Sequence, residues 1–179
     1  MPILTPRLEL IPASLEHFEA ELLGRDALES ALDVGVPESW PPELYDEAAI
    51  RYMIDWLQAH SGEEEWGLYY VVRRAALGEA RLLIGACGFK GAPDDDGLVE
   101  LGYGILPEHQ RRGYATEAVG GLVEFAFTSP AVRSVTAQTL PHLEPSIRVL
   151  EKAGFRFTGS GHDPQAPPGG EVIRYERAR

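Results

Sequence analysis

The chain contains very little cysteine, since Cys87 is the only one among its 179 residues. A single thiol cannot form an internal disulfide, which excludes the class of small secreted domains held together by disulfides. Cys87 lies in an apolar stretch, so we expect it to pack in the core and not to act as a nucleophile. The five histidines lack the short spacing of metal ligands, and the sequence therefore predicts no metal site.

Long hydrophobic runs are also absent. The apolar stretch 82–89 is far shorter than the ~20 residues that a helix needs to cross a bilayer, and residues 1–10 contain no signal-peptide core. We therefore expect a cytoplasmic protein without a membrane partner. The sequence has no internal repeat or low-complexity tract, and 44% of its residues are apolar, so residues 1–179 are expected to form a single domain.

Positive charge is scarce. Lysine and arginine number 16 against 28 acidic residues, which gives a formal net charge of -12. A negative field of this size repels phosphodiester backbones, so we expect no nucleic-acid partner. A cationic small molecule or a peptide amine suits the charge better, although solubility alone explains it equally well.

Hydrophobic periodicity and turn residues predict a mixed α/β fold, in which helices pack on the faces of one mostly antiparallel central sheet. We expect about six to seven strands and about four helices. The predicted strands are 7–12, 67–73, 82–90, 98–106, 134–140, 155–161 and 171–177. The predicted helices are one beginning near Leu15 after the N-cap Ser14, then 46–60, 114–129 and 145–153, with a proline-rich loop over 35–44.

The strand at 98–106 has one nearly bare face. Because side chains alternate along a strand, Leu101, Tyr103 and Ile105 share a face that can pack in the core, whereas Glu100 shares the other face with two glycines. Glycine weakens a strand, so this spacing favours either a ligand lying close to the backbone or a bulky helix that needs clearance.

The segment that follows this strand reads "QRRGYATEA" from Gln110 to Ala118. A helix is predicted to begin near Tyr114, and a helix N-terminus offers free N–H groups and a partial positive charge to an anion. Small residues at Gly113 and Ala115 allow a phosphate to approach the backbone, and the two arginines add charge. The dinucleotide and P-loop motifs do not fit, because the third glycine of the first motif and the lysine of the second are missing.

This segment matches the Q/R-x-x-G-x-G/A loop of the GCN5-related N-acetyltransferase (GNAT) superfamily, with Gln110, Gly113 and Ala115 at the defining positions. A second stretch, "PSIRVLEKAGF" at 145–155, resembles the closing helix and strand of the ribosomal-protein-alanine acetyltransferase (RimJ/RimL) branch. "ELGYGILPE" and the first strand, "TPRLELIPA", are also similar to that branch. The resemblance covers about residues 82–158.

The resemblance implies direct transfer of an acetyl group from acetyl-CoA to a primary amine, either a protein N-terminus or a small amine, without an acyl-enzyme. It implies no metal cofactor, and it leaves open whether the chain forms a homodimer. The pantetheine arm is expected near Ile105 and Leu106. The pyrophosphate is expected on the backbone amides of Arg111, Arg112, Gly113, Tyr114, Ala115 and Thr116.

Two residues are candidates for the chemistry, which needs a neutral amine and a proton for the leaving thiolate. Glu100, on the bare face, is the candidate base; the alternative is a glutamate that meets only solvent. Ser146 matches a serine of the ribosomal-protein branch that could hydrogen-bond the sulfur; the alternative is an ordinary first-turn serine. Aromatic residues could wall an acceptor pocket or simply fill the core, namely Trp40, Trp66, Tyr69 and Tyr70.

The chain also departs from the family. Leu150 stands where many members have a catalytic tyrosine, and the sequence contains no asparagine, although many relatives carry one just before the serine. These departures leave a second function open, that of a catalytically degenerate acyl-CoA-binding regulatory protein.

Overall fold

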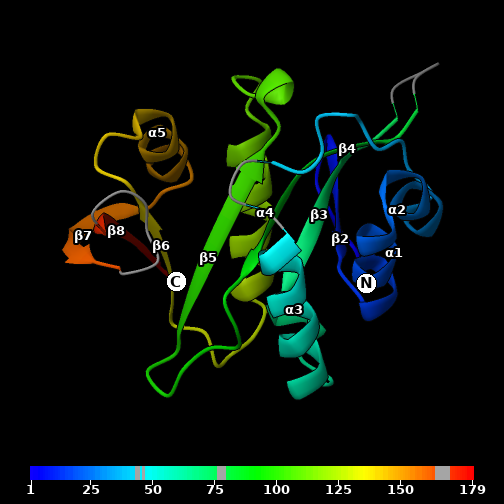
Figure 1. Cartoon of the computed structure of the whole chain (residues 1–179). Helices are drawn as coiled ribbons and strands as arrows, with labels where there is room; N and C mark the ends of the chain where they lie inside the picture. Colours follow the sequence, from blue (N-terminus) through cyan, green and yellow to red (C-terminus); the bar gives the residue numbers. More distant parts are fainter. Residues whose placement is uncertain (43–44, 46, 76–79, 164–169) are drawn as a thin grey trace.

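In the computed structural model, which describes residues 1–42, 45, 47–75, 80–163 and 170–179, one sheet runs through the whole chain (Figure 1). The strand order is β1-β2-β3-β4-β5-β6-β8-β7. The strands are β1 (Ile3–Leu4), β2 (Leu8–Pro12), β3 (Leu68–Arg73), β4 (Leu82–Phe89), β5 (Leu98–Ile105), β6 (Ser134–Thr139), β7 (Arg156–His162) and β8 (Glu171–Ala178). All neighbouring strands pair antiparallel except β5 and β6, which are parallel.

This architecture confirms the predicted mixed fold with a mostly antiparallel sheet. The described residues contain eight strands and five α-helices, slightly more than the sequence predicts. The added strand β1 has two residues, too few for a periodic pattern, and exists only because it pairs with β2. The added helix comes from Gly24, whose φ of 121° separates α1 (Leu15–Leu23) from α2 (Arg25–Leu32).

Helices cover both faces of the sheet. On one face, α1, α2 and α3 (Glu47–Ala59) bury a cluster that includes Phe18, Leu28 and Ile50. On the other face, α4 (Tyr114–Ala126) buries Val119 and Leu122 against the sheet. The fifth helix, α5 (Glu144–Lys152), packs beside α4 and β6 (Figure 1). Helices thus cover much of both faces, so a site has to lie at the ends of the strands or where the covering helices leave part of a face open.

Gly121 explains how closely α4 approaches the sheet. A Cβ atom at this position would lie 2.9 Å from Cγ2 of Thr5, so the contact requires glycine. At Gly120, a Cβ would meet nothing within 4 Å. Close helix-to-sheet contact thus accounts for one of the two mid-helix glycines.

Candidate active site

The strands β5 and β6 diverge at the centre of the sheet. Their parallel pairing joins Leu98–Leu101 to Ser134–Ala137, while β5 continues to Ile105 beside β4 alone in the described part of the chain (Figure 1). Backbone groups alternate between the two edges of a strand. The carbonyl of Glu100 on β5 accepts from Lys90, which follows β4, and the N–H of Leu106, which follows β5, donates to Ile84 of β4, so the even-numbered residues bond on the β4 side. Tyr103 and Ile105 therefore direct their backbone groups into the gap between the diverging strands β5 and β6, here called the opening.

Most backbone groups at the end of this opening, at Ile105 and Leu106, already have partners. Ile105 keeps its N–H, but its carbonyl accepts a hydrogen bond of 2.9 Å from Nε2 of Gln110. Leu106 is fully buried; its N–H donates to Ile84 and its carbonyl accepts from His109. These bonds leave Leu106 no free backbone group for a pantetheine arm, whereas Ile105 can still donate one hydrogen bond.

The loop after β5 has the geometry of an anion site. Arg111 and Gly113 adopt positive φ angles of 60° and 81°, and Gly113 is the N-cap of α4 without any side chain capping the helix. The loop is exposed at both arginines and at Gly113, while Tyr114, Ala115 and Thr116 form the first turn. A non-glycine residue such as Arg111 in this region is uncommon and points to a constraint from function. The uncapped N–H groups and the helix dipole favour an anion here.

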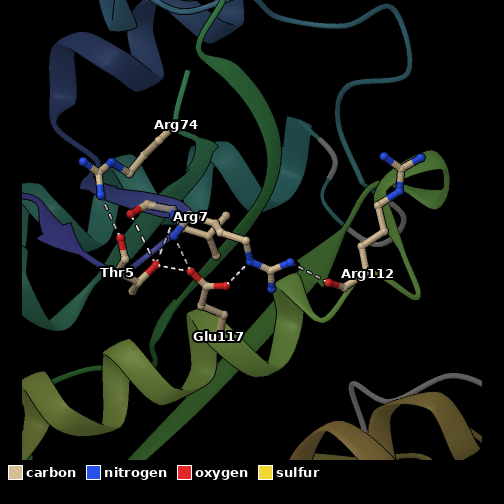
Figure 2. A network of polar contacts seen from close by, with 6 residues as sticks. Thr5, Arg7, Arg74, Arg112 and Glu117 are labelled. Carbon is tan, nitrogen blue, oxygen red and sulfur yellow. Dashed lines mark hydrogen bonds and ion pairs between the residues drawn. The ribbon is translucent and has the colours of Figure 1, made fainter. Parts of the chain in front are cut away.

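Arg7, from the turn before β2, holds this loop against α4, and Figure 2 shows it between Glu117 and Arg112. Its Nε lies 2.6 Å from Oε2 of Glu117, and its Nη1 donates to the Arg112 carbonyl at 2.9 Å. Thr5 donates its hydroxyl to the same carboxylate at 2.6 Å. Burial alone favours the neutral acid, but the hydrogen bonds from Thr5 and Arg7 outweigh it and lower the pKa of Glu117. Nothing in the sequence pattern indicated this role for Arg7.

The bare face of β5 opens into a cavity of about 270 Å³, here called the glycine-floored cavity. Small residues line it on the sheet side, namely Ala86, Gly88, Gly102 and Gly104. The other walls include Pro42, from the loop before α3, and Met53 of α3. A Cβ at Gly102 would meet nothing within 4 Å, and one at Gly104 would stand 3.6 Å from Pro42. The glycines therefore leave room for a ligand, and Gly102 is not explained by clearance for a helix.

A partly buried carboxylate supports one wall of this cavity. Glu21 of α1 accepts hydrogen bonds from Trp40 at 2.6 Å, from Tyr45 at 3.0 Å and from Tyr70 at 2.7 Å. Burial raises the pKa of Glu21. Tyr45 lines the cavity directly, whereas Trp40 and Tyr70 act behind it. Trp66 and Tyr69, also considered as pocket walls, are buried in the core on the α4 side.

Glu100 has two polar partners, so it does not meet only solvent. It forms an ion pair with Lys90, which lines the glycine-floored cavity, and its Oε2 accepts from Nε2 of Gln138 at 3.0 Å. Its side chain is 25% exposed. The carboxylate is thus held in one orientation beside the cavity.

Ser146 contacts the phenol of Tyr103, a residue that side-chain alternation places on the core-facing side of β5. The hydroxyl of Tyr103 lies 2.8 Å from Oγ of Ser146 and 3.1 Å from its carbonyl oxygen. Burial raises the pKa of Tyr103 to about 12, so this group remains a proton donor near neutral pH. Leu150, at the family's tyrosine position, is fully buried. A phenol from β5 therefore stands beside the serine of α5.

Three further features concern the single thiol, metal ligands and membrane spans. Cys87 is 3% exposed, and burial raises the pKa of its thiol well above the usual range, which agrees with a packing role. Among the described residues, no group of three or more His, Cys, Asp or Glu side chains could hold a metal ion. In the same part of the chain, no helix combines the length and apolar character that crossing a bilayer requires.

Two curated relatives are similar in sequence. The uncharacterized N-acetyltransferase YjdG of Bacillus subtilis is 30% identical over 116 residues, which cover 65% of this chain and 66% of that protein. The uncharacterized N-acetyltransferase p20 of Bacillus licheniformis is 30% identical over 114 residues, or 64% and 62% of the two chains. The chain thus matches a little under two thirds of the length of these relatives.

Solved structures show the same fold. A GNAT-family acetyltransferase from Bacillus anthracis superposes with a TM-score of 0.64 at 21% identity, over 99% of this chain and 98% of that one. RimL, a ribosomal alpha-N-protein acetyltransferase in complex with coenzyme A, superposes with a TM-score of 0.67 at 16% identity, over 99% of this chain and 98% of that one. The sequence model described as an acetyltransferase (GNAT) domain matches residues 7–156. Because this match spans most of the chain, the protein belongs to the GNAT acetyltransferase family.

Proposed function

We propose that this chain, acting as one domain over residues 1–179, transfers an acetyl group from acetyl-CoA directly to a primary amine. The observation that carries the proposal is the loop from Arg111 to Gly113. It bends through two positive φ angles into an uncapped helix N-terminus, at the end of a strand whose edge is open. This arrangement suits a diphosphate followed by an extended arm.

In this proposal the diphosphate lies on the amides of residues 111–116, and the pantetheine arm follows the open edge of β5. The backbone groups of Tyr103 and the N–H of Ile105 are the expected partners of its amides, in place of Leu106. The thioester then lies near the Tyr103 and Ser146 hydroxyls, which donate a hydrogen bond to the departing sulfur. No covalent enzyme intermediate is required, because the only thiol of the chain is buried.

The glycine-floored cavity is the proposed acceptor site. Most of its lining is apolar, and Lys90, its one charged lining residue among those described, is paired with Glu100. Such a cavity suits a primary amine carried on a small apolar group, including a peptide N-terminus. The net charge of -12 attracts cationic amines, and Glu100 receives the amine proton directly or through water.

Filling this cavity tests the acceptor site. Gly102→Val places a β-branched side chain, which strands tolerate well, in space where a Cβ meets no atom within 4 Å. We expect the KM for the amine to rise about tenfold or more, while the Kd for acetyl-CoA and the melting temperature stay nearly unchanged. Steady-state kinetics and calorimetry measure these effects. An unchanged KM for the acceptor would place the acceptor elsewhere.

Removing the charge of Glu100 tests the base. We expect Glu100→Gln to lower kcat about 100-fold, because general base catalysis typically contributes 100-fold or more. Glu9→Gln is a matched control, since Glu9 is also an ion-paired strand glutamate, bonded to Arg81 far from the cavity. A Glu100→Gln enzyme with the rate of the unmutated protein would exclude Glu100 as the base.

The second candidate function is an acyl-CoA-binding regulator without turnover. It is motivated by Leu150 at the family's tyrosine position and by the absence of asparagine from the sequence. The Tyr103–Ser146 pair supplies the donor that Leu150 cannot, which favours the enzyme. Tight acetyl-CoA binding combined with no turnover on a broad panel of peptide and small amines would favour the regulator.

A further inference from the structure

A second cavity, of about 390 Å³, lies beside the cofactor loop and is here called the arginine cavity. Its described lining contains three arginines and no acidic residue. The lining residues are Pro6, Arg7, Arg73, Arg74, Ala75 and Tyr114. In a chain with 28 acidic and 16 basic residues, such a concentration of positive charge calls for a specific partner.

The topology of the sheet assembles this cavity. β3 runs parallel to β5, because each is antiparallel to β4. The C-terminal end of β3 at Arg73 therefore lies at the same end of the strands as the loop after β5. Arg74 follows, with its backbone N–H 2.9 Å from Arg7 O and its Nη1 3.0 Å from Thr5 O (Figure 2). Tyr114, the first residue of α4, closes the cavity beneath Arg7, whose guanidinium lies 4.7 Å from the ring centre.

Arg7 and Arg74 differ in how far their positive charges are neutralised. Arg7 is paired with Glu117, whereas Nη1 of Arg74 donates a hydrogen bond to the neutral carbonyl of Thr5. Arg74 is exposed and therefore keeps a positive charge at the cavity mouth. Guanidinium groups bind phosphate through two parallel hydrogen bonds, and several of them together match a phosphate monoester.

We propose that the arginine cavity binds the 3′-phosphate of coenzyme A. This inference rests on the proposed function, since the diphosphate of the same cofactor is placed on the adjoining loop. Arg7 joins the two sites: it lines the cavity, and its Nη1 lies 2.9 Å from the carbonyl of Arg112 in the loop. The cavity thus distinguishes coenzyme A from analogues that lack the phosphate monoester.

The test compares coenzyme A with 3′-dephospho-coenzyme A by calorimetry. We expect the unmutated protein to bind coenzyme A about tenfold more tightly, the size of effect that a hydrogen bond between charged groups produces. Arg74→Gln should remove most of this preference by weakening coenzyme A binding, with little effect on the dephospho compound. Arg74→Lys, which keeps the charge, should retain part of it. The preference of the unmutated protein should also fall as salt rises.

Arg156→Gln is the control for net charge, because Arg156 is exposed on β7, at the opposite edge of the sheet. It should leave the preference intact. Equal affinity of the unmutated protein for both compounds would overturn the inference and leave the proposed function standing. A preference that survives Arg74→Gln would also overturn it. Failure to bind either compound would instead refute the proposed cofactor.

Discussion

Gly113→Trp is expected to weaken acetyl-CoA binding by at least about 100-fold, the equivalent of losing two hydrogen bonds to a charged group. Gly113 is exposed, caps α4 and has a φ of 81°. A Cβ at this position would stand 3.3 Å from Nη2 of Arg7, so a bulky side chain has to extend over the loop where the diphosphate is proposed to lie. Isothermal titration calorimetry measures the loss.

The control must separate this steric effect from backbone strain. A side chain at positive φ costs roughly 1–2 kcal/mol of stability wherever it occurs. Gly62 has a φ of 93° and lies beyond the end of α3, and a Cβ added there would meet no atom within 4 Å. Gly62→Trp should therefore lose similar stability while binding acetyl-CoA normally. If the Gly113→Trp protein is folded and binds as tightly as the Gly62→Trp protein, the diphosphate does not lie on this loop.

The second large effect concerns the hydroxyl pair of Tyr103 and Ser146. We expect Ser146→Ala to lower kcat by about 100-fold while changing the Kd for acetyl-CoA little, because a donor to the leaving sulfur acts mainly in the transition state. Tyr103→Phe should cause a comparable loss, because the two hydroxyls are 2.8 Å apart and one orients the other. The double variant should be little slower than either single variant, since residues that act as a unit are non-additive.

The pH dependence gives a further check on this pair. With burial raising the pKa of Tyr103 to about 12, its phenol stays protonated through the working range, so its ionisation should not limit the rate between pH 7 and about pH 10. Tyr175→Phe is a control, since Tyr175 lies on β8 and packs against Phe157. Single losses below about threefold would return Ser146 to a structural role, and independent, additive losses would show that the two hydroxyls do not act together.

Local patterns in the sequence were sufficient to predict most of the fold. The expected strand at 82–90 is β4 (Leu82–Phe89), and the expected strand at 98–106 is β5, ending at Ile105. Ser14 caps α1 by accepting a hydrogen bond from the backbone N–H of His17, as its position before an apolar helical pattern indicates. These features depend on residues within a few positions of each other. The strand β1 has only two residues, too few for a periodic pattern, so periodicity carried no signal for it.

The difference between local patterns and long-range contacts also applies to the candidate site. By itself the sequence indicated the loop that we propose binds the cofactor, because a glycine, a small residue and a helix start at fixed spacing act through their own backbone. Only the tertiary structure brought Arg7 to Glu117, which lie 110 positions apart, or Tyr103 to Ser146, 43 positions apart. Strand order and helix packing determine such long-range contacts, and no local spacing in the sequence encodes them. For that reason the loop was predicted from its motif, whereas the hydroxyl pair and the arginine cavity emerged only once the sheet had placed their residues side by side.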